Sequence, residues 1–374
     1  MNDTGRRAGR SLSVADMADL ARGCAFLGSG GGGDPRSTLI ELEALMGPEG
    51  SVELVDVESL DDDALIAPCG WIGAPTVSDE KLPSGEEGLL GLRRLEKLLG
   101  RRAQAVFPIE IGGSNGLAPM LLALRAGLPV VDCDGMARAF PESQMVIFNI
   151  RGLKACPAVL TDDKGNCFVI EAVDNLSEER IARAVTVVLG ASCHLMEYPL
   201  TGLEAKATVL RGTLSDALAI GRSIRLGRER HGDPFVALFE SLRTSRQFSS
   251  AGVLFDGKVV DLHRETKDGF SVGRVVIEAF DSKRRLEVEF RNENLVARLD
   301  GEVRALVPDL ITIANRATAE IIVTERLKYG QNVRVIGASA PATLREPGAL
   351  AILGPQAFGI KVPYQNIAEL NGWD

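Results

Sequence analysis

Hydrophobic positions in the first half of the chain alternate between helical and strand-like spacing. Residues 13–27 carry apolar side chains three and four positions apart behind Ser13, which predicts an amphipathic helix capped by that serine. A second helical pattern opens at Pro35. Strand-like runs follow at 51–57, 64–69, 104–109 and 128–132, with helical patterns at 86–99 and 117–126 between the later ones. This order predicts an α/β layer with a mainly parallel sheet.

The second half of the chain changes from helical patterns to hairpins. Helical spacing continues at 177–190, 213–226 and 233–243. The runs 253–260 and 296–307 are each joined across Asp-Gly, the strongest short-range hairpin signal, and 277–290 is similar with a looser turn. At 374 residues the chain exceeds the usual size of one domain. We predict an α/β domain at 1–167 and a β-rich, barrel-like domain with a few helices at 168–374, although the turn at 162–166 would equally well join two strands.

Composition limits the partners and the compartment. The formal net charge is −9, from 42 Lys and Arg against 51 Asp and Glu, so the chain repels phosphate backbones and anionic bilayers at long range. We expect neither nucleic acid nor a membrane as a partner, whereas a homo-oligomer is compatible with the sequence. The chain has no apolar run of roughly 20 residues and no signal-peptide core. Its six cysteines form no C-x-x-C pair, and these features together predict a cytoplasmic protein.

Candidate chemistry gathers in the loops that follow three predicted strands. Ligands of open parallel sheets bind beyond the carboxyl ends of the strands, so these loops should meet at one edge. Glu110 and Asp132 are each the first polar residue after a strand, where a turn favours Gly, Asn or Ser more than a glutamate. We expect one pocket to collect residues of all three loops: Lys81, Glu110, Gly112, Gly113, Asn115, Asp132, Asp134 and Glu142. Each of them alone has a simpler explanation, as a helix cap or a turn residue.

Four carboxylates in one pocket would repel one another unless something shares the site. A proton, a lysine or a hard cation would relieve that repulsion. One hypothesis is therefore a Mg²⁺ or Mn²⁺ ion held by Glu110, Asp132 and Asp134, and the alternative is that Lys81 neutralises part of the charge. The three histidines stand well apart and form no zinc-binding pair, which disfavours a multi-histidine zinc hydrolase.

The glycine-rich stretch at 28–33 predicts a site for an anion. No Lys-Ser/Thr follows it and no strand precedes it, so it is neither a Walker motif nor a dinucleotide fingerprint. Consecutive glycines before a helix expose backbone N–H groups, and the amides of Gly30, Gly31, Gly32 and Gly33 are candidates to bind a substrate carboxylate or oxyanion. The alternative is a tight turn that needs positive φ at one or two of these positions.

The obvious nucleophiles are weak candidates. Cys133 stands between Asp132 and Asp134, two negative charges that should raise the pKa of its thiol. Cys193 and His194 are adjacent, and adjacent residues of a strand point to opposite faces. Ser29 has no histidine assigned to it, so a serine triad has little support.

Eight segments follow one another along nearly the whole chain: FLGSGGGGDP (26–35), GAPTV…EKLPSGEE (73–87), EIGGSNGLAPM (110–120), LPVVDCDGMARAFPESQM (128–145), RNENLVA (291–297), VPDLI (307–311), TERLKYG (324–330) and LGPQAFG (353–359). Together they resemble the S-methyl thiohydantoin desulfurase family, long catalogued as a domain of unknown function beside hydantoinase and oxoprolinase genes. The resemblance implies an N-terminal three-layer α/β domain and a C-terminal β-rich domain. Two positions depart from it: Cys133 stands where a small residue is usual, and Asn315 where an aspartate is common.

The resemblance implies cleavage of a C–S bond at the thioamide carbon of a five-membered thiohydantoin ring, leaving a hydantoin. Such chemistry needs an activated water, donors for the developing negative charge and an acid for the departing sulfur. Our assignment makes Glu110 or Asp134 the base and Lys81 the charge stabiliser or acid, with Asp132 and Glu142 as the next candidates for the base. The amides of Asn115, Gly112 and Gly113 would orient the ring, and those of Gly30–Gly33 would bind the anionic end.

Two other functions stay open at this stage. The chain would also suit a non-catalytic partner or ligand-sensing subunit of a hydantoinase-type or oxoprolinase-type hydrolase. A metal-dependent, amidohydrolase-like enzyme that opens the ring at a C–N bond is the third interpretation. Free sulfide or thiol among the products would indicate the desulfurase, whereas a ring-opened acid would indicate the amidohydrolase-like enzyme.

Overall fold

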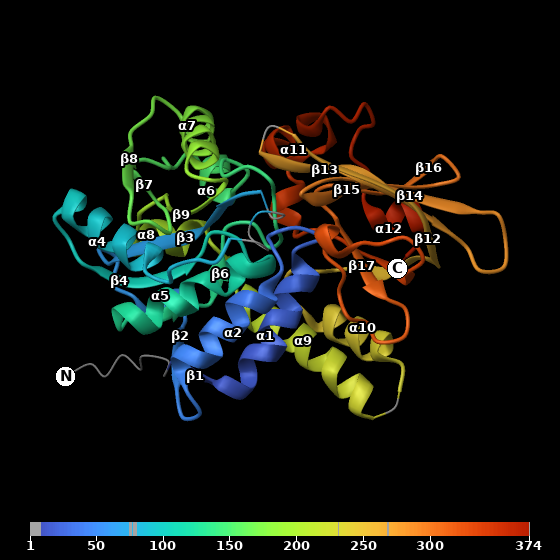
Figure 1. Cartoon of the computed structure of the whole chain (residues 1–374), viewed down its shortest axis with the longest axis horizontal. Helices are drawn as coiled ribbons and strands as arrows, with labels where there is room; N and C mark the ends of the chain where they lie inside the picture. Colours follow the sequence, from blue (N-terminus) through green and yellow to red (C-terminus); the bar gives the residue numbers. More distant parts are fainter. Residues whose placement is uncertain (1–8, 75–76, 78–80, 231, 268, 374) are drawn as a thin grey trace.

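Two β-sheets, one in each half of the chain, organise the protein (Figure 1). The computed structural model describes residues 9–74, 77, 81–230, 232–267 and 269–373. Within these ranges no helix is both long and apolar enough to span a membrane. The predicted α/β half and β-rich half are both present, so the predicted fold class is confirmed.

The first sheet has parallel strands at its centre. β2, β5, β4 and β3 lie side by side in that order, and each neighbouring pair is parallel. Antiparallel strands extend this centre on both sides, β1 beside β2 and β9, β7 and β8 beyond β3, while β10 pairs with the start of β3. The bounds are β1 Arg10–Ser13, β2 Ser51–Val55, β3 Leu65–Gly73, β4 Ala103–Pro108, β5 Val130–Val131, β7 Ala158–Thr161, β8 Cys167–Ile170, β9 Ser192–Met196 and β10 Leu200–Thr201.

Helices cover both faces of this sheet. Leu65 and Ala67 of β3 join a core with α1, α2, α4 and α5, whereas Ile66 joins a second core with α6 and α8. This division follows from the alternation of side chains along a strand. The result is a three-layer arrangement, with bounds α1 Val14–Leu27, α2 Pro35–Met46, α4 Glu87–Leu99, α5 Ala118–Ala126, α6 Ile147–Ile150, α7 Asn175–Val188 and α8 Gly202–Thr208. The cap predicted at Ser13 forms, because its N–H and hydroxyl donate to Asp16 at the start of α1. Pro35 is the first residue of α2, as predicted.

The turn at 162–166 joins two strands of the first sheet. Asp162 accepts hydrogen bonds from the N–H groups of Lys164 and Asn166, which shapes the turn between β7 and β8. β8, β9 and β10 then continue the first sheet beyond residue 167. The predicted division between residues 167 and 168 itself stays a prediction.

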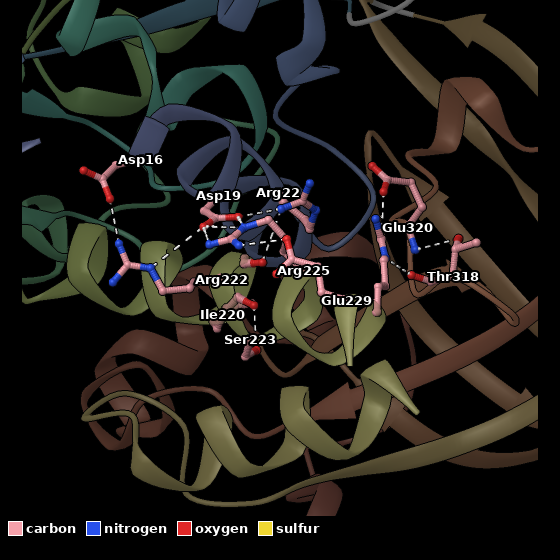
Figure 2. Close-up of polar contacts among 12 residues, drawn as sticks. Asp16, Asp19, Arg22, Ile220, Arg222, Ser223, Arg225, Glu229, Thr318 and Glu320 are labelled. Atoms are coloured by element: carbon pink, nitrogen blue, oxygen red, sulfur yellow. Dashed lines mark hydrogen bonds and ion pairs between the residues drawn. The ribbon is translucent and has the colours of Figure 1, made fainter. Parts of the chain in front are cut away.

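A helical pair connects the two halves of the chain. α1 packs along α9 (Thr213–Glu229), which in turn contacts α10 (Pro234–Thr244). Figure 2 shows Asp19 of α1, 1% exposed, between two arginines: Arg22 Nη1 donates to it at 2.8 Å and Arg225 Nη2 at 2.9 Å. A buried charged carboxylate costs free energy that ion pairs of this kind offset. The pairing therefore fixes the position of α1 against α9.

The second sheet is antiparallel and curved. Its order is β16-β15-β14-β13-β12-β18-β17, and each strand in it is antiparallel to its neighbours. Asn294 of β15 donates from its side chain to the carbonyl of Ile311 in β17 at 2.7 Å, so the two sides approach each other and the sheet forms a half-barrel. The bounds are β12 Ala251–Lys267, β13 Phe270–Glu278, β14 Arg285–Arg291, β15 Glu293–Leu299, β16 Glu302–Leu306, β17 Leu310–Asn315 and β18 Asn332–Ala338, with α11 Pro347–Leu353 and α12 Ile367–Asn371 after them.

One of the predicted hairpins is wrong. The Asp300-Gly301 turn joins β15 to β16, and the looser turn joins β13 to β14, as predicted. The chain at Asp256-Gly257 instead runs straight on inside β12. Asp256 pairs with Arg334 of β18 at 2.7 Å, and a Cβ at Gly257 would lie 2.3 Å from the carbonyl oxygen of Glu278. This glycine permits close approach of strand β13, so the Asp-Gly pair has a packing role there.

Candidate functional site

A cavity of about 570 Å³ lies between the carboxyl end of the first sheet and the start of β15. Its wall takes residues from the end of β3, the loop after β4, residues 136–143, β9 and, from the second half of the chain, Asn292 and Glu293. A volume in this range suits a small ligand. Of the predicted site residues, the wall contains Gly32, Gly33, Lys81, Glu110, Asn115 and Glu142.

Glu110 follows β4 and is 5% exposed. Its Oε1 accepts a hydrogen bond from Asn115 Nδ2 at 2.5 Å, and its Oε2 accepts one from the N–H of Phe140 at 3.0 Å. Burial raises the pKa of Glu110 to about 7. The two hydrogen bonds favour the charged form and lower the pKa, but the effect of burial is larger. A carboxyl with a pKa near neutrality can both accept and release a proton under ordinary conditions.

Asn115 holds Glu110 in place. Its Oδ1 accepts from the N–H of Trp71 at 2.6 Å, while its Nδ2 donates to Glu110. The side-chain amide thus links the end of β3 to the loop after β4, because both strands deliver their carboxyl ends to the same edge. Asn115 therefore orients the carboxyl group in the cavity wall.

Glu293 is the second carboxyl group at this place, and sequence reasoning missed it. It begins β15, is 2% exposed and lines the cavity. Its Oε1 accepts from the N–H of Gly32 at 3.3 Å, while its Oε2 has no partner among the described residues. Burial, with the charge of Glu110 next, raises the pKa of Glu293 well above its ordinary value. Burial thus favours the neutral, proton-donating form of Glu293.

A buried guanidinium lies behind the two glutamates. Arg138 is 1% exposed and donates to the backbone carbonyls of Ala139, Pro308, Asp309 and Asn294 at 2.7–3.2 Å. Its charge lowers the pKa of Glu110 and of Glu293, opposing the effect of burial on each. An arginine keeps its charge in proteins, so a fixed positive charge lies behind the two glutamates and bonds to the backbone and not to either carboxyl group.

Asp132 and Asp134 do not lie in the cavity wall, contrary to the expectation of one shared pocket. Asp132 accepts from the N–H and the hydroxyl of Ser215 at 3.0 and 2.6 Å, and so caps the first turn of α9. Asp134 is fully buried, and its Oδ2 accepts from the N–H groups of Ile111, Met136 and Ala137 at 2.8–3.1 Å. Asp134 therefore stabilises the loop that carries Glu110, whereas Asp132 joins the end of β5 to α9.

The predicted metal-ion ligands therefore do not converge. Glu110, Asp132 and Asp134 each bond to a different part of the chain. The described residues contain no group of three or more His, Cys, Asp or Glu arranged to hold a metal ion. Burial raises the pKa values of Glu110 and Asp134 to about 7, which lowers their average negative charge near neutral pH without a cation.

Lys81 and Glu142 lie at the rim of the cavity, each in an ion pair. Lys81 Nζ contacts Asp163 at 2.6 Å and donates to the carbonyl of Ser192 at 3.1 Å. Glu142 accepts from Arg291 Nη2 at 2.7 Å. The motif that contains Lys81 also includes residues 75, 76 and 78–80, which lie outside the described residues.

The glycine-rich loop is held between the two halves of the chain. The N–H of Gly31 bonds the carbonyl of Gly28 at 2.9 Å, and the N–H of Gly32 bonds Glu293. Gly30, Gly32 and Gly33 have positive φ, and a Cβ at Gly32 would lie 2.4 Å from the carbonyl oxygen of Gly112. The loop thus packs tightly on Gly112 and Gly113, neither of which lines the cavity. The binding of an anion by the backbone amides of this loop stays a prediction.

Family comparisons agree with this architecture. A model described as the S-Me-THD-like N-terminal domain matches residues 15–172, and one described as the S-Me-THD-like C-terminal domain matches residues 173–367. The chain belongs to the S-Me-THD-like family. The family membership expected from the eight segments is thereby confirmed. No curated protein matches the chain.

The S-Me-THD-like chain also resembles a solved structure. The crystal structure of a protein from Chromobacterium violaceum superposes with a TM-score of 0.80 and is 26% identical in sequence. The match covers 96% of this chain and 100% of the other. The fold of this chain is therefore similar to that protein over its whole length.

The two departures of this S-Me-THD-like chain fall outside the cavity wall. Asn315 accepts from the N–H groups of Ala317 and Thr318 and shapes the turn after β17. Cys133 is fully buried in β6 (Cys133–Asp134), which pairs with β11 (Leu210–Arg211). Burial, then the charges of Asp134 and Asp132, raises the pKa of its thiol well above the ordinary value. The thiol is therefore not activated as a nucleophile.

Replacing Cys133 with alanine should leave turnover within about twofold, while lowering the free energy of unfolding by about 1 kcal/mol through loss of packing. Turnover is measured in a single-turnover assay with an S-methyl thiohydantoin, and unfolding with urea. Abolished turnover in Cys133→Ala, with a covalent adduct on the wild-type thiol, would contradict this expectation.

Proposed function

We propose that the protein hydrolyses a thiohydantoin, removing the sulfur substituent to leave a hydantoin. The observation that carries this proposal is the pair of buried carboxyl groups, Glu110 and Glu293, in the wall of one cavity. One has a pKa near neutrality and the other a pKa well above its ordinary value, which suits a base and an acid in one site. The family name, S-Me-THD-like, supports an S-methylated ring as the substrate.

In this proposal Glu110 activates a water molecule. The water oxygen forms a bond to the ring carbon that carries sulfur, and one water proton passes to the Glu110 carboxylate. The C–S bond then breaks while neutral Glu293 gives its proton to the sulfur, so methanethiol leaves. The second water proton returns to Glu293 from the new oxygen, and Glu110 passes its proton to the ring nitrogen. Both carboxyl groups are thus restored, and the products are a hydantoin and methanethiol.

The other residues of the site position these groups. Asn115 keeps the Glu110 carboxyl turned toward the cavity through its bonds to Trp71. Arg138 lowers the energy of negative charge on either glutamate without forming an ion pair with one of them, because backbone carbonyls occupy its donors. Preorganised charge of this kind stabilises a transition state without reorganisation at the moment of reaction.

Replacing Glu293 with glutamine should lower methanethiol release by roughly 10²-fold, because the amide fills the same volume and cannot deliver the proton. The assay is a single turnover with an S-methyl thiohydantoin, with thiol and hydantoin quantified separately. A substrate with a 4-nitrophenylthio group needs little protonation to leave, so it should restore most of the rate of Glu293→Gln.

Two results would contradict this function. A ring-opened acid formed without thiol would mean cleavage of a C–N bond. No turnover of any thiohydantoin by the purified wild-type protein, under conditions where it binds the ring, would mean a ligand-sensing or partner role.

A further inference from the structure

Residues 140–143 form a segment of the cavity wall that bonds directly to the proposed base. The N–H of Phe140 donates to Glu110 Oε2 at 3.0 Å, and all four residues of the segment line the cavity. This hydrogen bond stabilises the carboxylate and lowers the pKa of Glu110, in opposition to burial. The contacts that hold residues 140–143 in place therefore also act on Glu110.

Arg183 of α7 holds the segment from one side. Its Nη2 donates to the carbonyl of Pro141 at 2.9 Å. The same guanidinium forms an ion pair with Glu179, which accepts a hydrogen bond from the N–H of Ser143 at 2.9 Å. Two residues of the segment are thus joined to α7 through Arg183 and its partner.

Arg291 of β14 holds the segment from the second sheet, and one aromatic ring orients both arginines. Arg291 Nη2 donates to Glu142 at 2.7 Å. The guanidinium carbons of Arg183 and Arg291 lie over the ring of Phe270, 4.1 and 3.9 Å from its centroid, which are cation–π contacts. The ring matters most for Arg183, whose Nη1 is buried and has no hydrogen-bond partner among the described residues.

Phe270 itself lies away from the ligand space. It begins β13, is 5% exposed and is absent from the wall of the first cavity. It lines a second cavity instead, together with Arg183, Arg291 and Glu142. A change at Phe270 therefore reaches the site through the arginines that pack on its ring.

We propose that Phe270 is a positioning residue for Glu110, acting through the two arginines and residues 140–143. This inference rests on the proposed function only where it treats Glu110 as the base. Asp134, Arg138 and Glu293 are the neighbouring charged groups whose fields act on Glu110, and none of them belongs to this cluster. Removing the ring of Phe270 leaves all of these charges in place, and those of the two arginines as well.

The first measurement needs no substrate. The pKa of Glu110 is measured by NMR on protein labelled with ¹³C at the glutamate side-chain carboxyl groups, and its signal is assigned by its absence in Glu110→Gln. In Phe270→Leu we expect this pKa to rise by about 0.5 or more, because the bond from Phe140 is weakened. Arg291→Lys keeps the charge and loses the flat guanidinium, so it should shift the pKa in the same direction.

The second measurement is steady-state turnover of an S-methyl thiohydantoin. Phe270→Leu should lower kcat by roughly tenfold, because the carboxylate is less well oriented toward the water. KM should stay within about twofold, since Phe270 does not line the first cavity. A substrate with a 4-nitrophenylthio group should show the same loss, because the defect lies in the base.

Two variants are the controls. Phe270→Tyr keeps the ring, and its hydroxyl can enter the second cavity, so it should keep both kcat and the pKa of Glu110. Phe280→Leu is the matched control, because Phe280 also packs against an arginine, Arg316 at 5.1 Å, but is 51% exposed and lines neither cavity. It should behave as wild type.

Three results would overturn the positioning role. One is an unchanged pKa of Glu110 in folded Phe270→Leu and Arg291→Lys. Another is recovery of the rate of Phe270→Leu with the 4-nitrophenylthio substrate, which would move the defect to Glu293. The third is an equal loss of kcat in Phe270→Tyr or Phe280→Leu, which would assign the loss to general packing of the second sheet.

The substrate-free measurement separates this inference from the proposed function. If the pKa of Glu110 rises in Phe270→Leu while wild type releases no thiol from any thiohydantoin, the positioning role stands and the reaction is wrong. If wild type releases methanethiol while this pKa stays the same in both variants, the reaction stands and the positioning role is wrong.

Discussion

Glu110→Gln should lower kcat with an S-methyl thiohydantoin by at least roughly 10²-fold, the expected loss for a general base. The amide keeps the volume and its oxygen can still accept the N–H of Phe140, while its NH2 group replaces the oxygen that accepts from Asn115. The loss of kcat should be the same for substrates with poor and with good leaving groups, because the base acts on water. This distinguishes Glu110→Gln from Glu293→Gln, whose rate a better leaving group should restore.

The pH dependence of the wild-type protein gives a second measure of the same group. Burial raises the pKa of Glu110 to about 7, so the carboxylate that acts as the base is lost as the pH falls below 7. kcat should fall about tenfold per pH unit below that value, and Glu110→Gln should lose this dependence. Glu302→Gln, at an exposed glutamate outside the cavity wall, serves as the control and should keep both the rate and the profile. A wild-type rate that does not change between pH 5 and pH 8 would count against Glu110 as the base.

As the pH rises, the stabilising contribution of Glu110 should fall while the activity of the wild-type protein rises. The pKa of Glu110 is higher in the folded protein, about 7, than its ordinary value of 4.5, so the folded state binds the proton more strongly than the unfolded state. Its stabilising contribution is complete below about pH 4.5 and is lost as the pH rises through 7. Urea unfolding should therefore show the stability difference between Glu110→Gln and wild type shifting in favour of the variant from pH 5 to pH 7.5.

The part of the site that follows from strand order was predictable. Glu110 and Asn115 come just after β4, and the rule that ligands bind beyond the carboxyl ends of parallel strands places them at the cavity. Asp132 obeys the same rule and is a helix cap instead, because the first turn of α9 lies beside the end of β5. Ser215, which donates to Asp132, is about 80 residues further along the chain, so no local pattern predicts this contact.

Glu293 was not predictable from any local pattern. It begins β15, a strand that is buried at nearly every position, so burial along the strand does not single it out, and its place at the cavity comes from residues far away in the sequence. Its segment, RNENLVA, carried part of the family resemblance, and Asn292 in that segment has a φ of 57°. The local signal in the sequence was a charged residue, Glu293, between Asn292 and Asn294 at the start of a strand, and it did not indicate which residues Glu293 would contact.

The glycines of α1 and α9 should be the most sensitive positions for folding. A Cβ at Gly221 of α9 would lie 1.7 Å from the carbonyl oxygen of Asp19, and a Cβ at Gly23 of α1 would lie 1.7 Å from that of Ala217. Alanine favours an isolated helix over glycine by up to about 1 kcal/mol, so propensity alone predicts stabilisation. The two backbones must separate to admit the methyl group, which also strains the contacts of Asp19 with Arg225 (Figure 2).

Gly221→Ala should therefore lower the free energy of unfolding by about 3 kcal/mol or more, at the upper end of the cost of overpacking. Gly348→Ala in α11 is the matched control, because a Cβ at that position would have no atom within 4 Å, so the same substitution should be neutral or stabilising there. Urea unfolding monitored by circular dichroism measures both variants. If Gly221→Ala were as stable as Gly348→Ala, α1 and α9 would adjust freely, and their close contact would not limit the stability of the fold.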